Sequence, residues 1–351
     1  MLPMSVAQYV LAALGLAVLM VVHEAGHYFA AKKFGMTVTR FSIGFGPRIW
    51  KYQRKNDPTV FQIALIPFLA YVQIAGMNPY EESDPKDPTS YANASLWARV
   101  VTIAAGPLAN YFFATILFFL GFLIGGRDIA NGVRVLKVED GGPAATAGIH
   151  DNDQVATVNG ETIKSSDQLM VIIGGKANTP IDIEILRDGA LQHVSVTPQP
   201  KGDKGEGKIA VHISTITRSE KIGVLEAAKL GFTEPPKVVI ALVVGLGRII
   251  TGKEKPQVSG PPGIVKEVAS AVQSGWGDAF KILGALSAYL GGFNLLPVPA
   301  LDGGRLMFLG FEAVARRRPD RKIEARIHAL GLLILLGIIA IASISDLIPK
   351  K

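Results

Sequence analysis

Long stretches without charged side chains alternate with polar segments along this chain. Four of them contain no Lys, Arg or Asp, and no Glu outside one short motif: Met1–Ala31, Val100–Gly126, Ile282–Leu301 and Ile327–Ser345. Each is about as long as the roughly 20 residues that a helix needs to cross a bilayer, or longer. The pattern predicts a polytopic α-helical membrane protein with four transmembrane helices, at residues 1–31, 100–126, 282–304 and 327–351, the last including the C-terminus.

A fifth apolar stretch affects the expected topology. Val238–Gly247 has only ten residues, a length that suits an interfacial or re-entrant helix. Residues 32–55 carry seven Lys or Arg and no acid, and residues 303–326 carry seven against three acids. Loops rich in Lys and Arg stay cytoplasmic, and both of these loops do so only if four helices cross the membrane. We therefore expect residues 32–99 and 305–326 inside and residues 127–281 outside the cytoplasm.

The first cytoplasmic loop, residues 32–99, contains a pattern of strands. Residues 37–43 and 60–65 are rich in β-branched and aromatic side chains, and a turn region with Gly and Pro separates them. This predicts a membrane-associated β-hairpin after the first helix. Its edge could pair with an unwound substrate through main-chain hydrogen bonds, or the hairpin could be purely structural. The residues alone leave both interpretations open.

Residues 127–200 alternate short strands and helices. The run A-x-x-A-G-I…D-x-V-x-x-V-N-G, from Ala144 to Gly160, resembles the PDZ domains of bacterial proteases of the permuted type. One extracytoplasmic PDZ domain is therefore expected. PDZ domains add a peptide strand to an exposed sheet edge, so this domain could bind the trimmed stub of a substrate, or its bulk could exclude substrates that are still untrimmed. A Gly-Leu-Gly-Phe carboxylate loop is absent from the sequence, which favours a filter that excludes untrimmed substrates. Residues 201–281 are expected to form a linker and interfacial helices.

The chemistry of the chain centres on His23-Glu24-Ala25-Gly26-His27, at the end of the first apolar stretch. In the pattern H-E-x-x-H on a helix, two imidazoles four residues apart lie on one face, where both can ligate one zinc ion. The Glu between them can take a proton from a water beside the metal. A carboxylate at membrane depth costs about 2.5–3.5 kcal/mol on insertion scales, so its presence there indicates function. The alternative is a chance match at an interfacial helix end.

A third protein ligand is expected, because catalytic zinc usually has three and keeps one open position. The chain has no Cys, so this ligand must be His, Asp or Glu. In a four-helix topology the first and third helices run in the same direction, and their C-terminal ends lie on one side of the membrane. The first ends with His23 and His27, and the third ends with Asp302. Asp302 is therefore the expected ligand, the alternative being a helix-terminal Asp among lipid headgroups.

The segment before Asp302 cannot continue a helix. Pro297 and Pro299 stand at alternate positions, so the chain must open at membrane depth. Irregular backbone is tolerated there where protein buries it or a watery cavity solvates it. Asn294 then lies where its amide could donate a hydrogen bond to the oxyanion of a tetrahedral intermediate. It could equally cap the broken helix.

These motifs together resemble the site-2 protease family of intramembrane zinc metalloproteases, and within it the bacterial regulator-of-sigma-E protease type. The motifs follow one another along nearly the whole chain: His23–His27, Phe41–Gly46, Gly106–Asn110 and Asn294–Gly304. The resemblance implies that His23, His27 and Asp302 bind Zn²⁺, that Glu24 is the general base and that Asn294 assists the oxyanion. It also implies a bacterial inner-membrane enzyme that cleaves transmembrane segments of single-pass membrane proteins, such as an anti-sigma factor or a signal-peptide remnant, in regulated intramembrane proteolysis.

Composition argues against other classes of function. The net charge is +7, and much of the excess lies in the two basic loops, where topology and anionic lipid headgroups explain it. No nucleic acid partner is therefore expected. A transporter or channel with a PDZ-regulated gate is disfavoured because the chain shows no pair of repeats. An inactive scaffold is disfavoured because His23, Glu24, His27 and Asp302 are all present.

Overall fold

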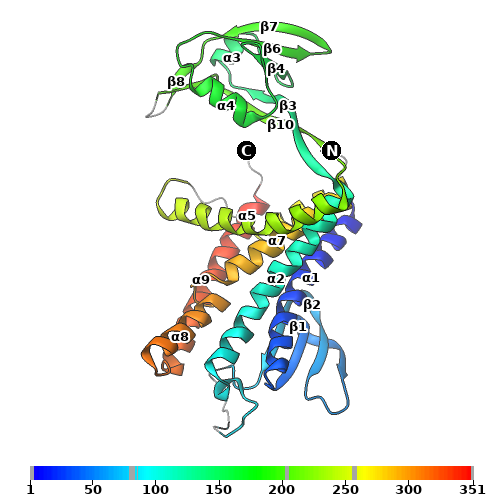
Figure 1. Ribbon diagram of the computed structural model, residues 1–351, viewed down its shortest axis with the longest axis vertical. Coiled ribbons are helices and arrows are strands. Elements are labelled where there is room, and N and C mark those ends of the chain that lie inside the picture. The colour runs from blue at the N-terminus through cyan, green and yellow to red at the C-terminus, as the bar shows by residue number, and fades with distance from the viewer. Residues whose placement is uncertain (1–3, 79–83, 85, 202–204, 255–258, 349–351) are drawn as a thin grey trace. The chain divides into compact units, whose positions relative to one another are not determined.

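The computed structural model of this protein contains two compact units. The first is formed by Met1–Gly125 together with Ile222–Lys351, and the second is Gly126–Lys221 (Figure 1). The structure describes residues 4–78, 84, 86–201, 205–254 and 259–348. The second unit is thus inserted between the two halves of the first.

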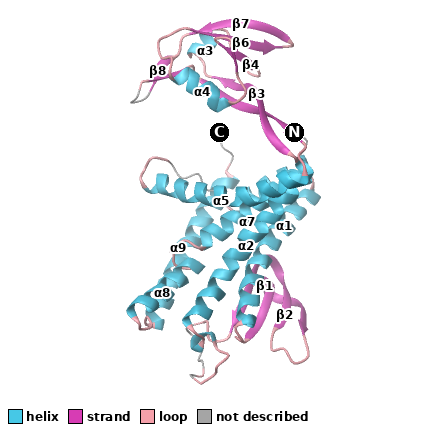
Figure 2. Ribbon diagram, viewed as in Figure 1, coloured by secondary structure: helices cyan, strands magenta, loops and turns pink. Residues whose placement is uncertain are grey.

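Helices make up most of the first unit, as Figure 2 shows. In chain order they are α1 (Val6–Lys33), η1 (Tyr91–Asn93, a 3-10 helix), α2 (Leu96–Gly125), α5 (Val224–Ile250), α6 (Pro261–Ser274), α7 (Trp276–Asn294), α8 (Asp302–Ala315) and α9 (Arg321–Leu347). Four helices within the described residues are long and apolar enough to cross a membrane: α1, α2, α5 and the part of α9 from Lys322 to Leu347. These helices fit the expected helical membrane protein.

The helices at residues 282–304 and 238–247 need to be compared with the prediction. The expected helix at 282–304 is interrupted as Pro297 and Pro299 predict: α7 and α8 are separate helices joined through these two residues, which lack the amide hydrogen that a helix requires. Conversely, Val238–Gly247 is no isolated ten-residue helix but part of α5, which has 27 residues. α5 contacts α2 and α7 and lies crosswise to them in Figure 1. α5 is long enough to cross a membrane. Its crosswise direction in Figure 1, however, is that of a helix that lies along one end of the helix bundle.

α2 and α7 pack backbone against backbone. A Cβ atom at Gly277 would lie 2.3 Å from Gly125 Cα, and one at Gly291 would lie 2.7 Å from the Pro107 carbonyl oxygen. The first contact joins the start of α7 to the end of α2, so the two helices run antiparallel. In a bilayer, where water does not drive helices together, small residues allow this close association. The packing fixes the end of α7 beside α2.

The expected hairpin consists of β1 (Val38–Gln53) and β2 (Val60–Ile74). The first part of β1 lies between two parts of β2, since Phe41 pairs with both Phe61 and Val72. The last residues of β2 therefore form an outer strand of this small sheet. A buried cluster that includes Met36 and Ile74 joins the hairpin to α1 and α2. Apolar side chains farther out on the hairpin are exposed, among them Trp50, as a surface in contact with lipid would require.

The second unit is a sheet with two helices. Its elements are β3 (Arg127–Val138), α3 (Pro143–Thr146), β4 (Gln154–Val158), β5 (Glu161–Thr162), α4 (Ser166–Gly174), β6 (Ile181–Arg187), β7 (Ala190–Val196), β8 (Gln199–Lys201), β9 (Glu206–Lys208) and β10 (Val211–Glu220). The main strand order is β10-β3-β4-β6-β7. Alternate residues of β6 point inward, and Ile181, Ile183 and Ile185 are almost fully buried, which is the period of a half-buried strand. They form the core of the unit with side chains from α4 and the other strands.

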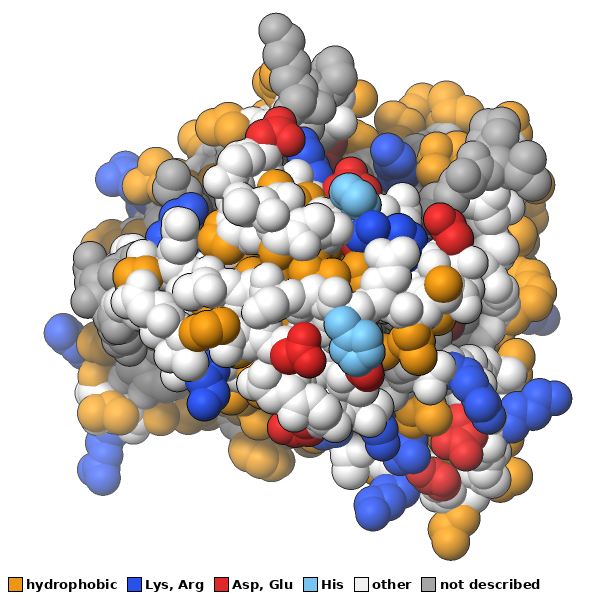
Figure 3. Space-filling model, turned by 90° about the horizontal axis from the view of Figure 1, so that it is seen from above, with side chains coloured by type: hydrophobic (Ala, Val, Ile, Leu, Met, Phe, Trp, Pro, Cys, Tyr) orange, Lys and Arg blue, Asp and Glu red, His pale blue; other side chains and the backbone are white. Residues whose placement is uncertain are grey.

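This unit extends beyond the predicted boundary at residue 200. β10 pairs with β3 along its whole length, from Val211 opposite Val138 to Glu220 opposite Arg127. The polar, Gly-rich composition of residues 201–208 is typical of a linker, so the strand that follows was not predicted. Residues 202–204 of that stretch lie outside the described residues. Figure 3 shows one face of the molecule, on which acidic and basic side chains lie among hydrophobic ones.

Candidate metal centre

Three side chains from two distant parts of the first unit converge on one point. Nε2 of His23 lies 3.2 Å from Nε2 of His27. Oδ2 of Asp302 lies 3.1 Å from His23 Nε2 and 3.3 Å from His27 Nε2. Both imidazoles are buried, and the Asp302 side chain is only 14% exposed. The structure thus brings together the three expected ligands, two from α1 and one from the first residue of α8.

The spacing of these atoms fits a zinc ion. A tetrahedral ion with bonds of about 2.0–2.1 Å separates its ligand atoms by about 3.3 Å, and the three observed separations are 3.1–3.3 Å. Asp302 Oδ2 is buried and has no hydrogen-bond partner among the described residues, so a cation there would satisfy it. Two imidazoles and one carboxylate are a donor set of known catalytic zinc sites.

The His27 ring is oriented by α2. Its Nδ1 lies 2.8 Å from the carbonyl oxygen of Thr102. A carbonyl only accepts hydrogen bonds, so Nδ1 carries the hydrogen and the Nε2 lone pair faces Asp302. Space for the ring exists because residue 106 is glycine: a Cβ atom there would lie 2.3 Å from His27 Nε2. The Thr102 carbonyl therefore fixes the orientation of the His27 ring, and Gly106 leaves space for it.

Glu24 is held by the hairpin. Its Oε2 accepts a hydrogen bond of 2.9 Å from the amide of Val72, which lies in the outer part of β2. The carboxylate stands beside His23 in the sequence and one turn from His27, so it lies on the side of α1 next to the two imidazoles. One hydrogen bond to Oε2 fixes the carboxylate and leaves Oε1 able to accept a proton.

Asn294 is the last residue of α7. Its Nδ2 donates a hydrogen bond of 2.9 Å to the carbonyl oxygen of Leu290, one turn earlier in the same helix. Leu290 precedes the last four residues of α7, so this bond lies within the helix and does not cap a carbonyl at its end. The capping role and the oxyanion role both stay predictions. An amide nitrogen has two hydrogens, so this bond does not use up its capacity to donate to a substrate.

The pattern of Peptidase family M50 matches residues 11–338 of this chain, which is most of its length. The chain belongs to Peptidase family M50. A protein of Nostoc sp. that carries a zinc metalloprotease name is 32% identical to this M50 protease over 340 residues, covering 94% of this chain and 93% of that protein. The regulator of sigma-W protease RasP of Bacillus subtilis is 27% identical over 403 aligned residues, covering 93% and 94%. The predicted family and the predicted zinc metalloprotease activity are confirmed.

Solved structures match a smaller part of this M50 protease. The crystal structure of the PDZ domain of an SdrC-like protein from Listeria innocua covers 24% of this chain and 93% of that chain, with 27% identity and a TM-score of 0.22. A PDZ domain structure from Listeria monocytogenes covers 24% and 87%, with 24% identity and the same TM-score.

Several residues around the site of this M50 protease were not found from the sequence. Thr102 and Gly106 orient and accommodate His27 across 75 and 79 positions of the chain, and the sequence singled out Gly106 only as part of the motif Gly106–Asn110. His328 is a further residue that the sequence did not connect with the site. Its Nδ1 accepts a hydrogen bond of 3.0 Å from the amide of Ala300, which helps to hold the loop before Asp302.

Proposed function

We propose that this M50 protease hydrolyses peptide bonds within transmembrane segments of single-pass membrane proteins, with zinc held by His23, His27 and Asp302. The observation that carries the proposal is the convergence of three ligand atoms at the spacing of a zinc site. Two of these atoms come from α1, a helix long and apolar enough to cross a membrane. The name of the Bacillus subtilis relative, a regulator of sigma-W protease, supports an anti-sigma factor as one substrate class; a signal-peptide remnant is another of the same chemistry.

The side chains around the metal centre have separate roles in the proposed hydrolysis. When bound, zinc supplies a Lewis acid that polarises the scissile carbonyl and makes a water acidic enough to lose a proton near neutral pH. Oε1 of Glu24 would take that proton and return it to the amine nitrogen as the peptide C–N bond breaks, while the Val72 amide keeps Oε2 in place. The second hydrogen on Asn294 Nδ2 donates to the oxygen of the scissile carbonyl as it gains negative charge. The buried setting of the two imidazoles limits access of bulk water.

Replacing Asp302 tests the metal centre. An Asp302→Ala protein is expected to bind zinc at least tenfold more weakly and to lose cleavage of a transmembrane substrate, because two imidazoles alone rarely hold catalytic zinc. Zinc content after dialysis and initial cleavage rates are measured on the same purified preparations. Asp278→Ala removes a half-exposed acid at the start of α7 and is the matched control. Wild-type zinc affinity in Asp302→Ala would overturn this assignment.

We also propose an inner-membrane protein with its active site toward the cytoplasm and the unit Gly126–Lys221 outside. The two basic loops support this orientation. Single cysteines can be introduced into the cysteine-free chain and labelled with a membrane-impermeant thiol reagent. Lys164→Cys is expected to be labelled in spheroplasts, whereas Lys55→Cys and Arg317→Cys are labelled only after permeabilisation. Labelling of Arg317→Cys from outside would show that α5 crosses the membrane as well.

We infer that the unit Gly126–Lys221 is a PDZ domain that binds peptides by strand addition. β10 is the last strand of the sheet order, and a cavity of about 760 Å³ lies between it and α4. Apolar side chains such as Met170, Ile173, Val211 and Ile213 line the cavity. An outer strand beside an apolar groove is the arrangement that accepts a peptide strand. These features favour binding over the simple filter that the absent carboxylate loop suggested.

Deleting this unit separates the two roles. If the groove holds trimmed substrates, a protein lacking residues 126–221 with a short linker in their place is expected to cleave a trimmed substrate more slowly, mainly through a higher KM. If the unit only excludes, untrimmed substrate becomes cleavable and the trimmed substrate is cleaved as before. Zinc content provides the check that the remaining unit is folded. The second result would contradict peptide binding.

A further inference from the structure

α2 connects the two groups of metal ligands. Its Thr102 carbonyl oxygen orients His27 of α1. One turn earlier, Arg99 contacts Glu312 of α8, and the first residue of α8 is Asp302. The position of Asp302 relative to the histidines therefore depends on how α8 is attached to α2.

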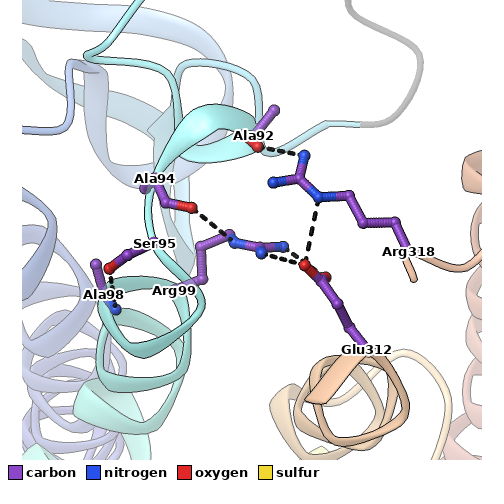
Figure 4. A network of polar contacts seen from close by, with 7 residues as sticks. All are labelled: Ala92, Ala94, Ser95, Ala98, Arg99, Glu312 and Arg318. Carbon is purple, nitrogen blue, oxygen red and sulfur yellow. Dashed lines mark hydrogen bonds and ion pairs between the residues drawn. The ribbon is translucent and has the colours of Figure 1, made fainter. Parts of the chain in front are cut away.

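The attachment is a network of charge-assisted hydrogen bonds, shown in Figure 4. Arg99 Nη1 donates to Glu312 Oε2 at 2.9 Å, and Nη2 donates to Oε1 at 2.6 Å. Arg99 Nε also donates to the Ala94 carbonyl oxygen at 3.2 Å. Arg318, in the loop after α8, donates from Nε to Glu312 Oε1 at 3.3 Å and from Nη1 to the Ala92 carbonyl oxygen at 2.6 Å. We call Arg99, Glu312 and Arg318 the α2–α8 clamp.

The clamp has the geometry and burial of a strong contact. The side chains of Arg99 and Glu312 are 7% and 14% exposed, and two parallel bonds from a planar guanidinium to a carboxylate define both distance and direction. Hydrogen bonding from Arg99 holds the pKa of Glu312 below its usual value, so the carboxylate is ionised at neutral pH. Removing one partner of such a buried pair leaves the other charge uncompensated.

The two ends of α8 are held in different ways. At its start, Gly303 packs so closely on the preceding loop that a Cβ atom would lie 2.0 Å from the Leu296 carbonyl oxygen. At its end, ten residues or about 15 Å along the helix axis, Glu312 is held by the clamp. A cavity of about 360 Å³ adjoins the clamp and part of α8, so α8 has room to tilt if the clamp is lost. A tilt about the start of α8 turns the Asp302 carboxylate, whereas metal–ligand distances in a well-formed site stay within about 0.2 Å of their standard values.

We propose that Arg99 and Glu312 are positioning residues of the protease, which set the orientation of α8 and thereby the fit of Asp302 to the metal shared with His23 and His27. This rests on the proposed function, because it assumes that Asp302 is a ligand. The side chains act through the helix and touch neither metal nor substrate. Arg318 reinforces the same carboxylate from the loop that leads into α9.

Two conservative variants test the clamp in the full-length protein. Glu312→Gln removes the negative charge of the carboxylate. Arg99→Lys keeps a positive charge but removes the planar guanidinium that makes two parallel hydrogen bonds. Each is expected to lower zinc affinity about tenfold, the low end of the cost of losing a partner that orients a ligand, as measured by chelator competition. At subsaturating zinc kcat falls with KM nearly unchanged, and excess zinc restores kcat. Arg187→Lys, which weakens a similar bidentate pair with Asp153 in the other unit, is the matched control and should leave zinc affinity unchanged.

A second readout needs neither zinc nor activity. Leu309, one turn before Glu312, is 7% exposed. In a Leu309→Cys background without zinc, thiol labelling is expected to be several-fold faster when Glu312→Gln or Arg99→Lys is added, because α8 is then less tightly held. Wild-type zinc affinity and wild-type labelling in both variants would overturn the proposal, as would faster labelling with unchanged zinc affinity. If Asp302→Ala itself binds zinc normally, the metal centre is wrong and the clamp proposal fails with it.

Discussion

A Glu24→Gln protein is expected to bind zinc like the wild type and to cleave a transmembrane substrate about 10²–10⁴-fold more slowly, the usual contribution of a positioned general base. The amide oxygen of Gln can still accept the hydrogen bond from Val72, and the three ligands are unchanged. The amide cannot take a proton at neutral pH, so only the chemical step should suffer. Zinc content and initial rates measured on one preparation separate these two effects.

Glu267→Gln is a suitable control, because residue 267 is an exposed acid on α6, outside the metal centre. Its zinc content and rate should equal those of the wild type. If Glu24→Gln retained zinc and cleaved at the wild-type rate, Glu24 would not be the base. If it lost zinc, Glu24 would have to be treated as part of the ligand set.

Gly106→Ala is expected to reduce zinc affinity and cleavage by at least 10²-fold, through a single added methyl group. The new Cβ atom would lie 2.3 Å from His27 Nε2, so the imidazole must leave its position, and a misplacement of about 1 Å can cost that much in rate. Alanine favours a helix over glycine by about 1 kcal/mol, so the loss would not come from a weaker α2. Zinc competition and cleavage assays measure both effects.

Gly245→Ala is the matched substitution, because a Cβ atom at that position of α5 meets nothing within 4 Å in the described structure. It should preserve zinc binding and activity and leave stability equal or slightly higher. Normal zinc affinity in Gly106→Ala would mean that His27 can move aside and still bind the metal, which would contradict the close fit of α2 around the ring.

The sequence was most informative where a function depends on local spacing. His23, Glu24 and His27 lie within one and a half turns of a helix, so their shared face follows from helical geometry. Asp302 required a further step, because only the parity of membrane crossings links residue 302 to residue 23. The structure brings these two side chains together even though α5 is longer than predicted.

Other features could not be read from the sequence, because they depend on contacts between distant residues. Arg99 and Glu312 are 213 positions apart, and in isolation each is an ordinary charged residue near the end of a helix. β10 was missed for a related reason, since its register is set by β3, some 80 positions away. The sequence prediction failed at the pairing of distant segments and not at their local structure. A local pattern shows that a segment can be a strand or a helix, but it does not show which other segment will pair with it or pack against it.

The metal centre also joins two distant parts of the chain. A zinc ion shared by α1 and α8 would link residues about 280 positions apart. Within a bilayer, where helices gain little by leaving lipid for one another, such a link is a strong reason for α1 and α8 to stay together. Because an ion that binds only the folded form stabilises it in proportion to the logarithm of its concentration, the supply of zinc would govern not only the rate of cleavage but also the stability of the assembled enzyme.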